Sequence, residues 1–435
     1  METVEVKALS GVSNAIEIKK TSSFLRKFLA FSGPGYLIAV GYMDPGNWVT
    51  DIAGGSKFGY KLIFVIFISN IMAILLQYLA IKLGVVAELD LAQACRRYYS
   101  KFTSFLLWIL AEIAIIACDI AEIIGFAIGL NLLFNIPIYI GVIITAFDVF
   151  ILLGLQNKSF RYLEFLVIFM ILIILVCLGI NIFLSNPNFS EIVYNCLFPT
   201  QEIISNNKML YITAGILGAT IMPHNLYLHS SIVRTRKYEN NFDSKSEAIK
   251  FMAIDSSLAL FLAFFINSAI LIVAAATFYM NGYFDVCELQ DAYKLLEPLL
   301  GTSIASTVFA IAILISGQNS TITGTLAGQI IMEGFIDLKL KPYVRRILSR
   351  SLAIVPAIFT IIFFGEHSLS NLLIFSQIIL SMQLSFAIFP LIQFTSQKEI
   401  MGKFKNSIKI KIASYFIACL IASLNLWLVY VSIKI

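Results

Sequence analysis

Two tetrapeptides place side chains with ligand chemistry inside long apolar stretches. They are Asp44-Pro45-Gly46-Asn47 and Met222-Pro223-His224-Asn225, with proline second and asparagine fourth in both. Proline removes a backbone donor and crowds the preceding helical turn, and glycine weakens a helix, so each tetrapeptide predicts a helix break. In a membrane, the carbonyl groups freed by a break need partners inside the protein. Paired breaks in two halves of a chain are typical of a transporter's binding site.

The side chains at the breaks indicate a site for a divalent cation. Asp44 offers an anionic oxygen, Asn47 an amide oxygen and Met222 a thioether. The breaks should also free the carbonyls of Gly41 and Ala219, about one turn earlier, and the first half-helix directs the negative end of its dipole at the gap. Oxygen ligands alone suit Mg²⁺ or Ca²⁺, whereas a thioether favours softer ions such as Mn²⁺, Fe²⁺ and Co²⁺. The alternative is that Met222 only packs beside the proline.

Two histidines raise the alternative of a metalloenzyme centre. His224 and His229 are five residues apart in the sequence, and that spacing separates two side chains by about 140° on a regular helix. Unlike in HExxH, no glutamate lies between them. We therefore expect a role in proton movement or gating near the break rather than joint ligation of one ion. A purely structural polar pair is the other reading.

A polar stripe follows the third apolar segment. Glu112, Asp119 and Glu122 are spaced by seven and three residues, so they lie along one helical face. Because acids facing lipid are costly, this face should point into the protein and pair with a cation, for which Arg350 is our candidate, with Arg346 one turn earlier. We interpret the stripe as a proton path, since several acids in series exceed what one structural pair needs. A static ion network is the alternative.

Amide side chains also occur in the middle of apolar segments. They are Gln77, Asn267, Gln318 and Gln377. Hydrogen bonding between helices is the default explanation for such residues in a membrane.

Membrane-spanning helices must position all of these residues. Of 435 residues, 59% are apolar and 13% charged, and apolar runs long enough to cross a bilayer, about 18 residues or more, recur along the chain. The sequence predicts an all-α integral membrane protein with about eleven spans: Phe31–Gly54, Leu62–Leu83, Phe102–Phe134, Pro137–Leu155, Tyr162–Leu184, Leu210–Val233, Phe251–Tyr279, Ser303–Phe335, Ile347–Phe364, Leu369–Phe394 and Ile410–Val431.

The positions of the breaks predict an inverted repeat. Five spans precede the second break, so residues 31–184 and 210–394 should have opposite orientations, joined by an external loop at 185–209. Residues 1–30 form a cytoplasmic segment, and residues 395–435 add a loop and an unpaired span. Basic residues such as Arg234, Arg236 and Lys237 gather in the even-numbered loops and near the N-terminus, which places both in the cytoplasm and the C-terminus outside.

Charge and cysteine content exclude several classes of protein. The net charge of +5 is spread over alternate loops, as membrane topology requires, so it does not indicate nucleic-acid binding. The six cysteines include no CxxC pair, which argues against a zinc or redox motif. Cys196 and Cys287 fall in predicted external loops, and an oxidising exterior would allow a disulfide between them. We expect no cleavable signal peptide before the first span.

With these motifs in place, the sequence resembles the Nramp family of proton-coupled divalent metal transporters over nearly its whole length. The resemblance rests on the first tetrapeptide and on longer runs that match the family: Gly218–Ser230, Ala111-Glu112, Cys118–Gly125, Ser316–Thr325 and Ser376-Gln377. One departure is Ser385, where a proline is expected after Gln383-Leu384; it affects the bend of the tenth span and touches no ligand.

The resemblance implies a LeuT-like fold and a set of ligands. The metal would be held by the residues that match Asp44, Asn47, Met222 and the Ala219 carbonyl, with Gln377 as a ligand in some conformations. The acids of the third span would form the proton route.

The reading that fits these observations is a secondary transporter, not an enzyme. It would import Mn²⁺ or Fe²⁺, and also Cd²⁺ or Co²⁺, with protons, by rocking the broken helices around a midplane site. Its partners would be these ions and the lipid bilayer, with no cofactor, in a monomer of a bacterial inner membrane. A metalloenzyme using His224 and His229 lacks a general base at the right spacing. A Mg²⁺ or Ca²⁺ channel is disfavoured by Met222 and by a single deep carboxylate, Asp44, since cation filters use rings of charge or carbonyls.

Overall fold

Two helices are interrupted in the middle of the molecule, at the two tetrapeptides. The computed structural model describes all residues except 1–15, 19–22, 148–159, 338–341, 366–367 and 435. In it, α2 (Pro34–Gly41) is followed by α3 (Pro45–Phe58), and α12 (Asn207–Thr220) by α13 (Pro223–Ile232). Each second half begins with proline at its first position, where a missing N–H breaks no helical bond. The two predicted breaks are therefore confirmed.

Long apolar helices surround the broken pairs. They are α4 (Ile63–Ala87), α6 (Lys101–Phe134), α9 (Phe160–Ser185), α14 (Phe242–Thr277), α16 (Ser303–Ile336), α17 (Pro342–Phe364), α18 (Leu369–Ser396) and α20 (Ile408–Lys434). Within the described residues, eight stretches are long and apolar enough to cross a membrane. The all-α membrane fold is confirmed. The seventh predicted span, Phe251–Tyr279, lies within a longer helical stretch, because α14 is capped by Asn241 and starts with a polar turn at Phe242.

The number of eleven spans stays a prediction. The helices α2, α12 and α13 are each too short to count as a crossing, and α3 is counted in one stretch with α4, Pro45–Ala87. The fourth predicted span, Pro137–Leu155, is represented by α7 (Ile138–Ile144), and its end lies outside the described residues. The predicted repeat boundaries at residues 31–184 and 210–394 likewise stay predictions.

Short elements connect these helices. The helical ones are α1 (Phe24–Phe31), η1 (Gly59–Leu62), α5 (Leu91–Tyr98), α10 (Phe189–Leu197), α11 (Glu202–Ser205), η2 (Val233–Thr235), η3 (Tyr279–Asn281), α15 (Leu289–Leu300), α19 (Lys398–Met401) and η5 (Gly402–Phe404). Two strands, β1 (Ile16–Glu17) and β2 (Arg236–Lys237), pair in parallel with Ile16 opposite Arg236.

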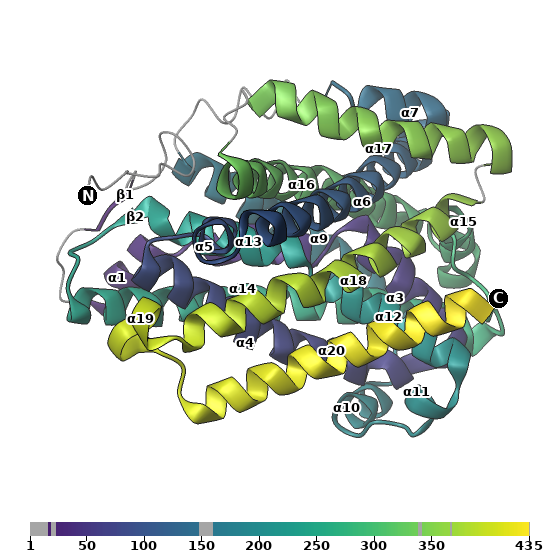
Figure 1. Cartoon of the computed structure of the whole chain (residues 1–435). Coiled ribbons are helices and arrows are strands. Elements are labelled where there is room, and N and C mark those ends of the chain that lie inside the picture. Colours follow the sequence, from purple (N-terminus) through teal and green to yellow (C-terminus); the bar gives the residue numbers. More distant parts are fainter. Residues whose placement is uncertain (1–15, 19–22, 148–159, 338–341, 366–367, 435) are drawn as a thin grey trace.

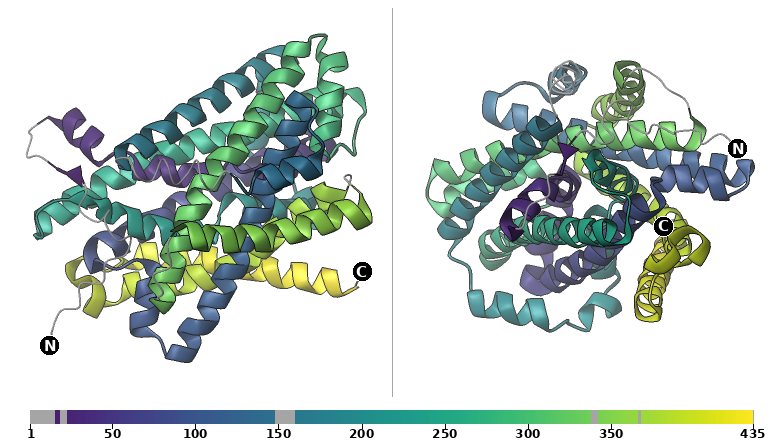
Figure 2. Two further views of the ribbon diagram at one scale, coloured as in Figure 1. Left: turned by 90° about the horizontal axis from the view of Figure 1, so that it is seen from above. Right: turned by 90° about the vertical axis from the view of Figure 1, so that its left-hand side faces the viewer.

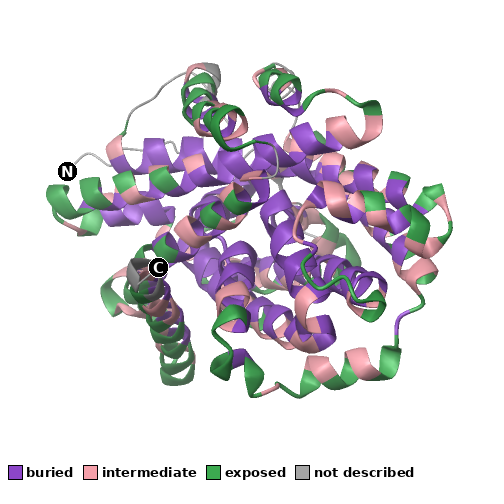
Figure 3. Cartoon of the chain, turned by 90° about the vertical axis from the view of Figure 1, so that its right-hand side faces the viewer, coloured by how far each residue is buried: buried purple, intermediate pink, exposed green. Residues whose placement is uncertain are grey.

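The broken helices lie inside the bundle. The α6 and α16 helices pack side by side (Figure 1), and α14 packs against α2, α3 and α4. Seen end-on, α20 lies at the periphery (right-hand view of Figure 2), where it packs on α18. Buried residues fill the centre and exposed ones cover the outside (Figure 3). Many exposed residues on the long helices are large and apolar, as lipid-facing surfaces require.

The predicted disulfide between Cys196 and Cys287 is wrong. Both cysteines are free. Cys196 lies on α10, which packs on η1 and α4, whereas Cys287 lies just before α15, which packs on α16. The two segments thus rest against different helices, which their position in loops of the sequence does not reveal.

Candidate metal-binding site

The two breaks meet, and most of the candidate ligands form one hydrogen-bonded group. Asn47 Nδ2 lies 2.7 Å from Asp44 Oδ1 and 3.0 Å from the carbonyl oxygen of Ala219. Gln377 Nε2, on α18, lies 3.5 Å from Asp44 Oδ2. Asp44 also caps α3 by accepting the backbone N–H of Asn47 at 2.9 Å. All of these residues are buried. The first break is therefore joined to α12 through the Asn47 amide and to α18 through the Asp44 carboxylate.

The amide of Asn47 presents its nitrogen to Asp44 and Ala219. Its Oδ1 lies instead 3.5 Å from Nδ2 of Asn267 on α14. The sequence predicted the amide oxygen as the ligand. An amide NH₂ offers two donors and so can bridge two acceptor oxygens. Ligation of a cation by Asn47 Oδ1 therefore requires the amide to turn over.

Met222 lies next to the helix that carries the acids. It caps the start of α13 and packs in a fully buried apolar cluster with Ala114, Ala117, Cys118 and Leu380. The first three of these neighbours are on α6 and the last is on α18. The packing alternative for this side chain is thus compatible with its position beside the break, and so is ligation.

Two glycines let side chains approach the breaks closely. The Gln377 amide occupies the space that a side chain at Gly46 would fill, and the Asn225 amide does the same at Gly41. Gly46 is therefore required for Gln377 to reach Asp44. Both polar atoms of the Asn225 amide lack a hydrogen-bond partner among the described residues, which leaves them available to a ligand at the break.

The carbonyls freed by the first break are bound by neighbouring helices. Asn267 Nδ2 on α14 donates to the Tyr42 carbonyl at 2.8 Å, and the Ser316 hydroxyl on α16 donates to the Met43 carbonyl. The expectation that mid-span amides join helices is confirmed for Asn267. These two bonds fix the unwound residues to two long helices.

The two histidines have different partners. His229 Nδ1 lies 2.9 Å from Gln77 Oε1, and Gln77 Nε2 donates to the Tyr42 hydroxyl at 2.9 Å. His224 Nε2 lies 3.9 Å from Cys118 Sγ on α6. The histidines thus do not face a common point, as their spacing predicted, and the metalloenzyme alternative loses its structural basis.

The acids of α6 meet two arginines of α17. Arg350 Nη2 lies 3.4 Å from Glu122 Oε2 and 2.7 Å from Thr321 Oγ1, and its Nη1 lies 3.4 Å from the Asp119 carbonyl oxygen. Asp119 and Glu122 are fully buried. The structure thus pairs Arg350 with the stripe, as the sequence predicted. Glu112 pairs instead with Arg345, at 2.9 Å, which the sequence reading missed. The side chain of Arg346 lies outside the described residues.

A second carboxylate lies near the first break. Asp51 is on α3, seven residues after Asp44, and is 1% exposed. Its Oδ2 has no hydrogen-bond partner among the described residues. The assumption of a single deep carboxylate is therefore wrong. Spacing of seven residues places both acids on one helical face, and this pattern was visible in the sequence.

A network of buried charges holds the start of α2. Asp255 on α14 accepts hydrogen bonds from the backbone N–H groups of Gly33 and Gly35, at 3.1 and 2.8 Å. A carboxylate at a helix N-terminus is favoured by the helix dipole. Beside it, Arg236 donates to Glu164 on α9 at 2.7 Å and to the Ser32 carbonyl.

The sequence reading placed Arg236 among the basic loop residues, but it is only 1% exposed. It is buried because its charge is compensated by Glu164. The signal for this network was the presence of Asp255 and Glu164 in predicted spans, since acids in a membrane need a cation.

The short helix α5 is hydrogen-bonded to α13. Asp90 caps α5 by accepting the N–H of Gln93 at 2.8 Å, and the Leu91 N–H donates to Ser230 on α13 at 2.9 Å. Burial raises the pKa of Asp90 from 3.8 to about 6, although the hydrogen bond from Gln93 and the charge of Arg234 oppose that shift. The α5 helix is thus tied to the second broken span by the bond from Leu91 to Ser230.

Similar proteins point to one class of transporter. Residues 35–431 match the family described as Nramp, natural resistance-associated macrophage protein-like. The divalent metal cation transporter MntH of Listeria welshimeri is 58% identical over 426 residues, which cover 98% of this chain and 95% of that protein. A crystal structure of the Eremococcus coleocola manganese transporter has a TM-score of 0.90 at 41% identity and covers 96% of this chain and 90% of its own. Mhp1, a nucleobase-cation-symport-1 family transporter in a closed conformation, has a TM-score of 0.62 at 14% identity over 91% of this chain and 90% of its own, and so shares the fold.

Proposed function

The chain belongs to the Nramp family and is a multi-pass membrane transporter of divalent metal cations, and from this premise we propose that it imports Mn²⁺ or Fe²⁺ with protons by alternating access. The observation that carries the proposal is the hydrogen-bonded group of Asp44, Asn47, Ala219 and Gln377 where the broken helices meet. Its relatives are named as transporters, and it is not an enzyme.

In the proposed site, Asp44 supplies the negative charge. Asn47 would turn its amide oxygen to the ion, the Ala219 carbonyl would exchange its hydrogen bond for the ion, and Gln377 would join in some conformations. Met222 would add a thioether, which favours Mn²⁺, Fe²⁺, Co²⁺ and Cd²⁺ over Mg²⁺ and Ca²⁺. The Eremococcus relative is named a manganese transporter, which supports Mn²⁺ as a substrate.

We propose that protons move along α6. Asp119, Glu122 and Arg350 form a buried polar group, and Cys118 connects it towards the break. Cys118 Sγ lies 3.6 Å from Glu122 Oε1 and 3.9 Å from His224 Nε2. A proton route separate from the metal ligands follows, with Glu112 and Arg345 at its far end.

Alternating access would use the contacts that hold α2 and α13. We propose that the bonds of Asp255 to the start of α2, and the chain from Tyr42 through Gln77 to His229, hold one side of the site closed. We place that side in the cytoplasm of a bacterial inner membrane, with the N-terminus, because basic residues gather there. β1 and the last turn of α20 lie at opposite ends of the bundle (Figure 1), which supports a C-terminus outside. The proposed unit is a monomer.

The test is metal uptake into vesicles that contain the purified protein, with internal pH recorded at the same time. An inward proton gradient should speed Mn²⁺ uptake, and Mn²⁺ should in turn acidify the interior. Asp44→Asn should abolish uptake, whereas Asp285→Asn, an exposed acid paired with Lys57, should not. Mn²⁺ entry without any proton movement would contradict proton coupling, and equal entry of Mg²⁺ or Ca²⁺ would contradict the ligand set.

A further inference from the structure

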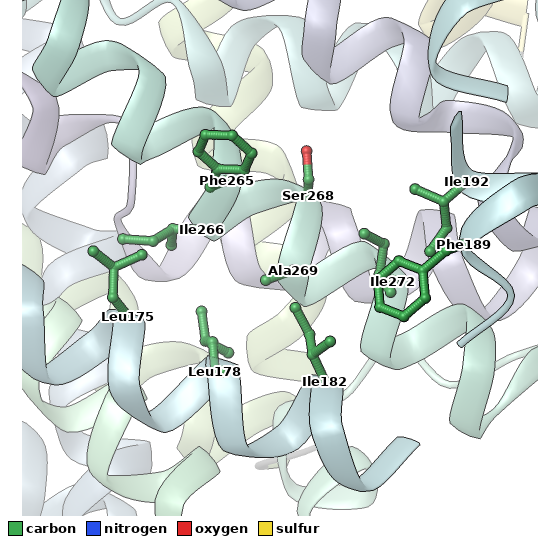
Figure 4. Close-up of a pocket in the computed structure, with 11 residues that line it drawn as sticks. Leu175, Leu178, Ile182, Phe189, Ile192, Phe265, Ile266, Ser268, Ala269 and Ile272 are labelled. Carbon is green, nitrogen blue, oxygen red and sulfur yellow. The ribbon is translucent and has the colours of Figure 1, made fainter. Parts of the chain in front are cut away.

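An apolar cavity of about 350 Å³ lies between α9, α10 and α14. Figure 4 shows Leu175, Leu178 and Ile182 of α9 facing Ile266 and Ala269 of α14 across it. Phe189 and Ile192 of α10 close one end, and Gly179, Phe265, Ser268 and Ile272 complete the lining. Its volume falls in the range of ligand sites, roughly 300–1,000 Å³.

The lining excludes water, ions and polar solutes as the occupant. Ser268 supplies the single polar side chain among the lining residues. A buried water needs two to four polar partners, and an ion needs more. Protein interiors hold few voids larger than a water molecule. We therefore expect this cavity, with its apolar lining, to contain an apolar ligand.

The cavity borders a lipid-facing stripe. On α9, Phe165, Phe169, Leu172 and Val176 are all at least half exposed, at spacings of three and four residues that place them on one helical face. The lining residues of α9 lie next to this stripe, and two rim residues, Phe189 and Phe265, are themselves more than half exposed. The surroundings of the opening are therefore bilayer hydrocarbon.

We propose that this cavity binds one acyl chain of a membrane phospholipid. On α14 its lining residues run from Phe265 to Ile272, on both sides of Asn267 at the metal site, and Phe189 and Ile192 of the surface helix α10 lie at one end. Transporter sites of this kind lie near the bilayer midplane, so the cavity runs along one leaflet, whose hydrocarbon is about 15 Å thick, half of roughly 30 Å. In the orientation proposed above, this is the outer leaflet.

The acyl chain would fill the side of α14 that faces away from the site. Asn267 holds the Tyr42 carbonyl at the first break at 2.8 Å, and the next two residues line the cavity. A chain seated there supports α14 against α9 and thereby the helix on which the first break rests.

Trp48 provides a local reporter. It is fully buried, and together with Leu178, which also lines the acyl cavity, it lines a smaller neighbouring cavity. The chain has 3 tryptophans, so Trp108→Phe with Trp427→Phe leaves Trp48 alone. In vesicles of phosphatidylcholine brominated on its acyl chains, Trp48 fluorescence should be quenched relative to vesicles of the unbrominated lipid.

Filling the cavity should remove the quenching. A Cβ added at Gly179 meets nothing within 4 Å, so a side chain there starts in open space. Gly179→Leu and Gly179→Phe should place bulk in the cavity, and the loss of quenching should grow with side-chain size. Val176→Phe, on the exposed stripe of the same helix, is the matched control and should keep it.

Equal Trp48 fluorescence in both lipids would overturn the proposal, and so would quenching that Gly179→Phe leaves unchanged. Such a result would mean a dry cavity or another occupant. The measurement uses neither metal nor protons, so its failure is distinct from a failure of the proposed transport.

Discussion

Asn47 Nδ2 lies 3.0 Å from the carbonyl oxygen of Ala219, so the two interrupted helices are hydrogen-bonded to each other where each one unwinds. The same nitrogen also donates to Asp44. One side-chain amide therefore occupies the position between two oxygens that a divalent cation would take in the proposed site. Binding a cation there and releasing the link between the helices become one event, which gives the substrate a direct means of changing the helix arrangement.

Met222→Ala should change selectivity more than capacity. The variant leaves an all-oxygen site around Asp44, and hard cations such as Ca²⁺ bind well to oxygen ligands alone. We expect Mn²⁺ uptake to fall by about tenfold or less, corresponding to ~1.4 kcal/mol, competition by Ca²⁺ to rise and the preference for Cd²⁺ to shrink. Uptake of Mn²⁺ and Cd²⁺ in vesicles, with and without Ca²⁺, measures this. Unchanged competition and preference would mean that the thioether only packs.

Asp119→Asn should reduce proton movement while leaving metal binding largely unchanged. The residue lies on α6, next to Cys118 and outside the group around Asp44, so metal binding should be retained while proton movement is lost or reduced. Isothermal titration with Mn²⁺ and internal pH in vesicles give the two readouts. Loss of metal binding as complete as in Asp44→Asn would place this acid in the metal site instead.

Gly46→Ala should weaken metal binding by displacing the Gln377 amide from Asp44. An added Cβ would overlap the Gln377 amide, and forcing extra atoms into a packed interior costs about 1–3 kcal/mol. We expect an affinity for Mn²⁺ about tenfold lower (~1.4 kcal/mol). The control is Gly179→Ala, where the same methyl group meets open space. If both variants bind Mn²⁺ like the wild type, Gln377 does not depend on this close approach.

Asp255→Ala should open the side of the site that we place in the cytoplasm. It removes the α14 carboxylate that accepts the backbone N–H groups of Gly33 and Gly35 at the start of α2, and losing a side-chain acceptor at a helix N-terminus costs about 1 kcal/mol. In a chain without native cysteines, Leu37→Cys on α2, fully buried in the structure, should then react faster with a thiol reagent applied from the cytoplasmic side.

Glu247→Ala is the control for this experiment. It removes an ion pair between Glu247 and Lys27 that is partly exposed to solvent, and such pairs contribute little. An equal increase in labelling for both variants would show that Asp255 has no special part in closing α2.

Asp90→Asn should flatten the dependence of stability on pH. Burial raises the pKa of Asp90 from 3.8 to about 6, so between these values the folded state holds more protons than the unfolded state. The free energy of unfolding should therefore fall as pH rises through this window and stay lower above it, by ~3 kcal/mol at most.

Asparagine keeps the cap without the charge, so Asp90→Asn should be as stable as wild type or more so at pH 7.5, with no gain at pH 4. Thermal unfolding in detergent at several pH values measures this. Glu88→Gln, at an exposed acid, is the control. A wild type whose stability rises between pH 4 and 6 relative to Asp90→Asn contradicts the assignment.

The sequence carried the parts of the site that are set by local chemistry. Proline and glycine inside apolar runs located both breaks, and the 7 and 3 spacing of the acids on α6 located their common face. Arg350 followed because buried acids need a cation. These inferences need only the helix period and the hydrocarbon surroundings.

The remaining features depend on which helices meet. The nitrogen of the Asn47 amide points to the site because its oxygen accepts from Asn267 of α14. Arg236 is buried because it pairs with Glu164 of α9. No spacing in the sequence predicts either contact. The two-residue strands β1 and β2 are likewise too short to leave a periodic signal.

The pairing of β1 with β2 sets an order for biosynthesis. Glu17 pairs with Lys237, and 237 − 17 = 220 residues separate them. At roughly 5–20 residues per second, a ribosome needs about 11–44 s to make this stretch. The first strand, and Ser32 whose carbonyl awaits Arg236, must therefore remain without these partners while the whole first half of the protein enters the membrane. During that interval, the beginning of the first span lacks its contacts with β2 and with Arg236.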